Sequence, residues 1–127
     1  MHLVADLMSS PVITIEQDAS AQTAAVLIAA KSVRHLVVLD RNARVVGVLS
    51  DRDIREARPS TLVVRDQVMR DKALAVMHVR DVMTGTPSTV DPNAPAIEVL
   101  RLMKAKKIGS VPVTSERGVL VGIVTGM

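Results

Sequence analysis

The hydrophobic and polar positions along the chain follow two periods, and each period predicts a different kind of element. Apolar residues at helical spacing (Ala21, Ala24, Ala25 and Ile28) predict a helix over 21–32, with Asp18 or Ser20 as its cap. β-branched runs predict a short strand at 12–15 and two longer strands at 33–39 and 44–49. A polar turn at 40–43 joins the longer strands into an antiparallel hairpin, and a helix over 51–58 follows. The predicted order is strand, helix, strand, strand, helix.

The same pattern returns in the second half of the chain. It predicts a short strand around 89–90, a helix over 94–107 capped by Asn93, and two strands at 108–113 and 119–124 joined by a turn at 115–118. Pro112 lacks an N–H group, so its strand should lie at an edge or at a non-bonded position there. One helical turn is expected at 4–8, and the connector between the halves should be helical over 65–77.

The two halves are copies of one unit. Shifting the sequence by 75 positions aligns residues 4–52 with residues 79–127 without a gap. The identical pairs are Val4/Val79, Asp6/Asp81, Met8/Met83, Thr14/Thr89, Ala19/Ala94, Ala21/Ala96, Leu27/Leu102, Ala30/Ala105, Lys31/Lys106, Val38/Val113, Val46/Val121 and Gly47/Gly122. A repeated unit usually cannot bury its apolar face alone. Two copies therefore predict a pseudo-two-fold pair with related clefts between its halves.

Composition narrows the function classes. The chain has 127 residues, is 48% hydrophobic and 23% charged, and contains neither aromatic residues nor cysteine. Without aromatic rings it cannot stack bases as single-strand nucleic-acid binders do, and without cysteine it has no thiolate nucleophile, thiolate metal site or disulfide. The net charge is +3, and the lysine and arginine residues are interspersed with acidic residues along the chain, so a nucleic-acid partner is not expected. The sequence has no signal peptide and no apolar run that could span a membrane, so we expect a cytoplasmic protein without a membrane partner.

The segment Gly47-Val48-Leu49-Ser50-Asp51-Arg52-Asp53 carries the strongest candidate chemistry. A glycine permits close approach of another backbone or a flat ligand. Ser50 can donate or accept a hydrogen bond, and an ionised Asp53 can accept from both neighbouring hydroxyls of a ribose. The alternative interpretation is a strand that ends in a helix N-cap and needs no ligand. Both interpretations remain open at this point.

An enzyme is not indicated, because the sequence has no Ser–His–Asp order, paired-carboxylate motif, P-loop or metal cluster. His2, His35 and His78 lack ligand spacing, so neither a metal site nor catalytic residues are predicted. The arginines Arg34, Arg52 and Arg55 are candidates for phosphate contacts or for simple surface charges.

Taken together, these features resemble a CBS domain. The similarity rests on Met-x(2–3)-Pro, a short strand with Thr, Asp-x-Ser in the first copy, an amphipathic helix, and two strands that end in Val-Gly-(Val/Ile)-(Leu/Val)-(Ser/Thr). The tandem resembles a CBS pair, or Bateman module, and its length resembles the stand-alone bacterial acetoin-utilisation type. The resemblance implies a mixed α+β fold in which two β-α-β-β-α units pack sheet to sheet. The units would be 1–58 and 79–127, with a helical connector at 59–78.

The resemblance also implies a ligand and its site. Ligands of such proteins contain adenosine: AMP, ADP, ATP, S-adenosylmethionine, NAD or cyclic dinucleotides, as regulatory ligands rather than required cofactors. Carried over by position, the first cleft would use Ser50, Asp53, Val48, Thr84, Pro87, Ser88, Ile108, Gly109 and Ser110. The second would use Thr125, Ser9, Val12, Ile13, Val33, Arg34 and His35.

The second motif reads Gly122-Ile123-Val124-Thr125-Gly126-Met127, so the position matching Asp53 lies beyond the last residue. We therefore expect the second unit to be truncated before its last helix and the natural chain to continue. The expected function is a regulatory module that senses an adenosyl ligand between its units and transmits a conformational change. The alternative is a dimerisation scaffold without ligand. A homodimer is expected, together with a further C-terminal domain or a separate regulated protein.

Overall fold

The fold is mixed α and β, as the sequence predicts. The computed structural model describes residues 1–60, 65–85 and 87–126. Contacts divide the chain into two compact units, Thr14–Gly85 and Met1–Ile13 with Thr86–Met127. In chain order the elements are α1 (Val4–Leu7), β1 (Thr14–Glu16), α2 (Ala21–Lys31), β2 (His35–Leu39), β3 (Val45–Ser50), α3 (Asp51–Ala57), α4 (Gln67–Ala75), α5 (Val79–Val82), β4 (Thr84–Gly85), α6 (Ala96–Lys106), β5 (Ser110–Thr114) and β6 (Leu120–Thr125).

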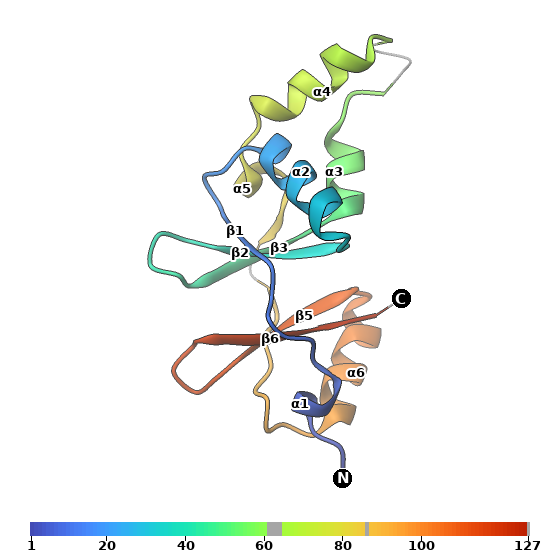
Figure 1. Ribbon diagram of the computed structural model, residues 1–127. Helices are drawn as coiled ribbons and strands as arrows, with labels where there is room; N and C mark the ends of the chain where they lie inside the picture. The colour runs from blue at the N-terminus through green and yellow to red at the C-terminus, as the bar shows by residue number, and fades with distance from the viewer. Residues whose placement is uncertain (61–64, 86, 127) are drawn as a thin grey trace. The chain divides into compact units, whose positions relative to one another are not determined.

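The unit Thr14–Gly85 is built on a sheet in the order β1-β2-β3-β4. β1 pairs with β2 in parallel, while β2, β3 and β4 pair antiparallel. The predicted hairpin of two long strands is therefore confirmed, with Leu36 opposite Leu49 and both fully buried. Helices α2 and α3 lie on one side of this sheet, and α4 contacts α2 (Figure 1).

Local sequence explains where these elements begin and turn. Ser20 caps α2, because its hydroxyl accepts the Thr23 N–H at 3.0 Å, and the helix ends at Ser32 in the left-handed conformation. In the hairpin turn the Asp40 carboxylate accepts the N–H groups of Asn42 and Arg44. The predicted connector helix is α4, which Asp66 caps. Residues 61–64 of the connector lie outside the described residues.

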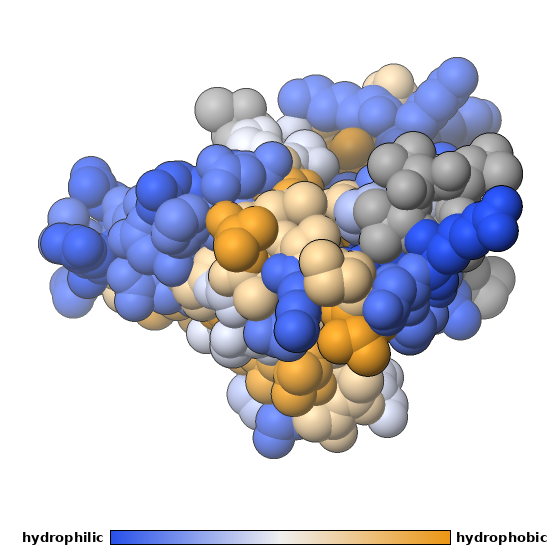
Figure 2. Space-filling view, turned by 90° about the horizontal axis from the view of Figure 1, so that it is seen from above, coloured by the Kyte–Doolittle hydropathy of each residue, from blue (hydrophilic) through white to orange (hydrophobic). Residues whose placement is uncertain are grey.

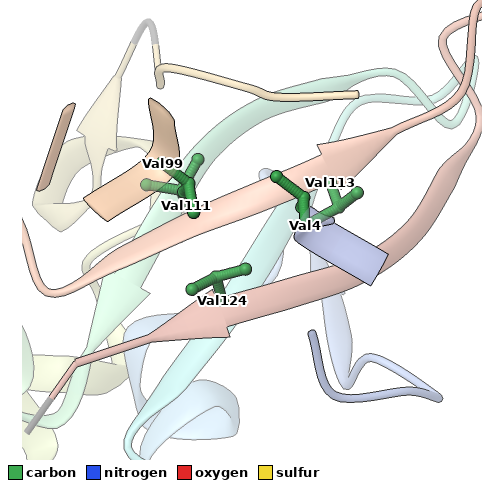
Figure 3. Close-up of a cluster of buried hydrophobic side chains, with 5 residues drawn as sticks. All are labelled: Val4, Val99, Val111, Val113 and Val124. Atoms are coloured by element: carbon green, nitrogen blue, oxygen red, sulfur yellow. The ribbon is translucent and has the colours of Figure 1, made fainter. Parts of the chain in front are cut away.

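The unit formed by residues 1–13 and 86–127 is built on the antiparallel hairpin β5–β6. Five valines fill its core, two of them from the helices and three from the hairpin (Figure 3): Val4, Val99, Val111, Val113 and Val124. Pro112 is buried, and within the described residues its strand has β6 on one side and an isolated bridge from Val90 to Val113 on the other. This agrees with the expected edge position of the proline.

Two sequence-based expectations for this second copy are wrong. Asn93 does not cap the helix: its own N–H donates to Asp91 Oδ1, and α6 begins at Ala96 after Pro95, whose backbone is extended. Pro95 disfavours the helical conformation at the preceding Ala94, so the first helical turn begins two residues later than expected. The strand expected around 89–90 is reduced to the Val90–Val113 bridge. Elements α5 and β4, by contrast, were not predicted.

Apolar side chains also reach the surface. Val26 of α2, Val68 of α4, and Ile97 and Leu100 of α6 are between 49% and 64% exposed. Figure 2 shows hydrophobic patches interrupted by hydrophilic side chains on one face of the molecule. Among the described residues, no helix combines the length and the hydropathy that crossing a membrane requires.

Candidate functional site

The strand-to-helix junction from β3 to α3 is closed by a reciprocal capping pair. The Ser50 hydroxyl accepts the Asp53 N–H at 3.0 Å, and Asp53 Oδ2 accepts the Ser50 N–H at 2.9 Å. Both side chains are partly buried. This is a capping box, which satisfies two backbone donors at the start of α3. The N-cap interpretation of Ser50 is thus confirmed.

The cap uses only part of the hydrogen-bonding capacity of these two side chains. A carboxylate has about four lone-pair sites and a hydroxyl has one donor besides its acceptors. Among contacts of the described residues, Asp53 Oδ1 has no hydrogen-bond partner and the Ser50 O–H has no acceptor. The cap therefore leaves a free carboxylate oxygen and a free hydroxyl proton next to each other, a combination that suits a sugar diol.

Three further candidate residues lie in the same unit as this junction. Thr84 of β4 is the register partner of Val48, and His35 of β2 is the register partner of Ser50. The carbonyl of Arg34 accepts the Asp51 N–H at 2.9 Å, which ties the start of β2 to the start of α3. Strand pairing thus gathers Thr84, His35 and Arg34 around the end of β3.

His35 is the one titratable candidate whose environment shifts its protonation. Burial lowers the pKa of His35 from 6.5, opposed by the carboxylates of Asp51 and Asp53 and assisted by the nearby Arg34. Its Nδ1 is buried and has no hydrogen-bond partner. Burial of a ring nitrogen without a partner favours the neutral imidazole, because the charged ring would lose its hydration.

The other unit holds the equivalent set of residues. Ser9 exchanges two backbone hydrogen bonds with Ile123, at 2.8 and 3.1 Å. Ser110 is the register partner of Thr125, and the Gly109 carbonyl accepts the Gly126 N–H at 2.8 Å. Ser110 is buried, whereas Thr125 is exposed. These contacts repeat those of Thr84, His35 and Arg34 at the offset of 75 positions.

Among the described residues, the remaining candidates make no hydrogen bond to these junctions. Lys106 Nζ donates to the Ser88 hydroxyl at 2.9 Å, a contact that sequence reasoning missed. Ile108 follows α6, and its N–H donates to the carbonyl of Met103 in that helix. The half-buried residues Val12, Ile13, Val33 and Pro87 line the segments that lead into or out of strands. The combination of residues from both units in one cleft stays a prediction.

The charged candidates differ in how they are paired. Arg52 pairs with Glu56 at 3.0 Å and Arg55 with Asp51 at 3.8 Å, both at the surface, whereas Arg34 has no ion pair within the described residues. No group of three His, Cys, Asp or Glu side chains that could hold a metal occurs in the part of the chain that the structure describes. Of the three candidate arginines, Arg34 is therefore the one without a competing ion pair and the most available to a phosphate.

Two methionines next to the candidate residues were not predicted to have a site role. Met83 lies against Gly47, and Met8 lies against Gly122. Both pairs are identical between the two copies of the sequence. Because both the methionine and the glycine recur at the offset of 75 positions, the alignment of the repeats could have identified the two methionines.

Comparison with known proteins gives one family for the whole arrangement. The family model for the CBS domain matches residues 4–60 and 79–126. A CBS domain-containing protein of Dictyostelium discoideum is 32% identical over 123 residues, covering 97% of this chain and 85% of that protein. A homoserine O-acetyltransferase of Methanococcoides burtonii is 30% identical over 121 residues, but the match covers only 22% of its length.

Solved structures agree with this assignment. A structure described as an acetoin utilization protein (AcuB) from Vibrio cholerae has a TM-score of 0.77 at 30% identity, with 98% of this chain and 84% of that chain covered. CBSX2 in complex with AMP has a TM-score of 0.78 at 28% identity, with 98% and 90% covered. The same values of TM-score and coverage hold for the CBS domain pair of protein MJ0100 in complex with 5′-methylthioadenosine and S-adenosyl-L-methionine, at 26% identity. The chain therefore belongs to the CBS domain family and has the fold of a CBS pair.

Proposed function

We propose that this chain is a regulatory module that binds an adenosyl ligand and passes the binding event on to a regulated protein or domain. The observation that carries the proposal is the capping pair of Ser50 and Asp53, which leaves one carboxylate oxygen and one hydroxyl proton free. Relatives of the same fold were solved with AMP and with S-adenosyl-L-methionine and 5′-methylthioadenosine, which supports a ligand of this class.

Four of the candidate residues have a defined part in the proposed site. Asp53 Oδ1 accepts from the ribose hydroxyls, and the Ser50 hydroxyl donates to a ribose or phosphate oxygen. Thr84, beside Val48, adds a second hydroxyl, and the unpaired Arg34 supplies positive charge for a phosphate. The adenine lies between aliphatic side chains, because the chain has no aromatic residue.

Regulation requires more than binding. A ligand shifts a conformational equilibrium only by its difference in affinity for the two states. We propose that the ligand prefers one arrangement of the chain, and that a further domain or a separate protein responds to it. An enzymatic activity of this segment is not proposed, since its enzyme relative extends far beyond the matched part.

The test is a thermal-shift panel of AMP, ADP, ATP, S-adenosylmethionine, NAD and cyclic di-AMP on the wild type and Asp53→Asn. Asparagine retains an oxygen for the Ser50 N–H but replaces the free acceptor with an N–H₂ donor. A ligand at 100 times its Kd adds about 2.7 kcal/mol to the stability of the wild type, and the variant should lose that gain.

Asp6→Asn is the matched control, because Asp6 Oδ2 accepts the Leu3 N–H at 2.8 Å as Asp53 Oδ2 accepts the Ser50 N–H, but Asp6 belongs to the other unit. It should keep the full ligand shift. A panel without any shift in the wild type, or equal shifts in wild type and Asp53→Asn, contradicts the proposed function.

A further inference from the structure

A methionine side chain occupies the space over the glycine of each motif. A Cβ atom built on Gly47 would lie 2.4 Å from Met83 Sδ, 3.1 Å from Met83 Cγ and 2.9 Å from the Thr84 carbonyl oxygen. A Cβ atom essentially never lies within 3.0 Å of a non-bonded atom, because carbon contacts are optimal near 3.5–4.0 Å. The Met83 side chain would have to shift to admit a Cβ on Gly47, and the contact with the Thr84 carbonyl oxygen is harder to relieve because that oxygen belongs to the backbone.

The methionine lies at the position where it can set a strand register. Met83 follows α5 directly, and the next residue begins β4, where Thr84 faces Val48 and Gly85 faces Gly47. β4 has only two residues, so its own hydrogen bonds are few. A thioether seated on Gly47 fixes the approach of the segment to β3 and so decides which residue of β4 comes to lie near Ser50.

The second unit contains the same contact between a methionine and a glycine, at other positions of the chain. A Cβ on Gly122 would lie 2.4, 2.9 and 3.1 Å from Met8 Sδ, Cγ and Cβ. Met8 likewise follows a four-residue helix, and Ser9 next to it pairs with Ile123. The recurrence at the same offset argues against accidental filling of a gap. An unbranched, flexible side chain is also the type that can lie flat on a bare backbone.

We propose that Met83 and Met8 are positioning residues: seated on Gly47 and Gly122, they place the hydroxyl residues Thr84 and Ser9 at the two ligand sites. The role at a ligand site rests on the proposed function, whereas the packing of the methionines on the glycines does not. Met83 acts through the strand that follows it and does not itself contact the adenosyl group.

The test uses AMP as the probe in isothermal titration calorimetry with Gly47→Ala. The added methyl displaces Met83, and Thr84 with it, so the affinity for AMP should fall about tenfold, the size of a typical overpacking penalty. Gly85→Ala is the matched control, because a Cβ there meets no atom within 4 Å. Its affinity for AMP should stay within about twofold of the wild type.

A double-mutant cycle separates positioning from general loss of packing. If Gly47 and Met83 act through their mutual packing contact, Gly47→Ala should cost much less affinity in a Met83→Ala background than in the wild type. In parallel, nuclear Overhauser contacts between residues 48 and 84, recorded without ligand, should be present in the wild type and Gly85→Ala and lost in Gly47→Ala. Independent, multiplying losses in the cycle overturn the inference, as does an unchanged 48–84 contact in Gly47→Ala.

These readouts also separate this inference from the proposed function. If the wild type does not bind AMP or any other adenosyl ligand, the proposed function fails and the ligand half of the inference fails with it. The 48–84 contact then still decides whether Met83 sets the position of Thr84.

Discussion

At the scale of single residues, Asp53 uses its two oxygens differently. One oxygen accepts the Ser50 N–H in the capping box, and the other has no hydrogen-bond partner among the described residues, so it is the oxygen that the proposed ligand would use. In the proposed site, stability and binding are linked at this residue, because removing the whole carboxylate also removes the acceptor of the Ser50 N–H in the capping box. Asp53→Asn is the sharper probe because it keeps an oxygen for that N–H while it removes the charge and replaces the free oxygen with an N–H₂ group.

His35 supplies a prediction on pH dependence. Burial lowers its pKa in the folded chain below 6.5, so the unfolded chain binds more protons in the window just below that value. The contribution of His35 to the free energy of unfolding should accordingly be fully present above pH 6.5. It should be lost as the pH decreases through this window. Urea unfolding at pH 7.5, 6.5 and 5.5 should show this loss in the wild type and a smaller loss in His35→Gln.

The outcome can be checked on the ring itself. The His35 resonance in an NMR titration should reach its midpoint below pH 6.5. Parallel stability profiles for wild type and His35→Gln, or a midpoint above 6.5, would contradict the burial argument.

At the scale of elements, the equivalent helices α2 and α6 begin in different ways. Ser20 accepts the Thr23 N–H at the start of α2, which contributes the buried Ala21 and Ala24 to the core. No such side-chain cap occurs at α6, where Pro95 precedes the first turn. The repeat therefore conserves the helix while its two copies differ in how they start it.

Ser20→Ala should lower the free energy of unfolding by about 1 kcal/mol, because the Thr23 N–H loses its acceptor. Ser20→Asp retains an acceptor and should restore most of the loss. Equilibrium urea denaturation of the three proteins measures both effects. Equal midpoints for Ser20→Ala and the wild type would show that the cap carries no stability.

At the scale of the whole molecule, exposed apolar side chains bear on assembly. Ile97 and Leu100 lie three residues apart on α6 and are each 49% exposed, while Ala96 and Val99 of the same helix are buried. Residues at this spacing share a helix face. The homodimer expected from the sequence would gain stability if it covered this face.

We predict that the chain is a concentration-dependent dimer and that Ile97→Glu with Leu100→Glu weakens the dimer at least about tenfold, since covering two apolar side chains contributes a few kcal/mol. Light scattering after gel filtration across a concentration series measures the change. Val119→Glu, at a 56% exposed site of the β5–β6 turn, is the control and should leave the dimer intact. A wild type that stays monomeric throughout would contradict the prediction.

The sequence by itself determined the repeat, the hairpins, most of the helices and the CBS family, because each of these depends on local periodicity, turn chemistry or an offset visible in the letters. Ser50 and Asp53 could be selected in the same way, since a hydroxyl and a carboxylate three residues apart at a strand end suit a cap and a ribose alike. The start of α6 was mispredicted because a proline outweighed the capping propensity of Asn93.

Only the tertiary structure decided which parts of the repeats combine. Elements α5 and β4 belong to the second copy by sequence but lie in the unit Thr14–Gly85, where Thr84 pairs with Val48 and the Val79 N–H donates to the Ala19 carbonyl. Segments of four and two residues are too short for a periodic signal, so long-range hydrogen bonds and the fit of Met83 on Gly47 place them. The physical reason is that these segments gain their stability almost entirely from distant partners, which a linear pattern does not record.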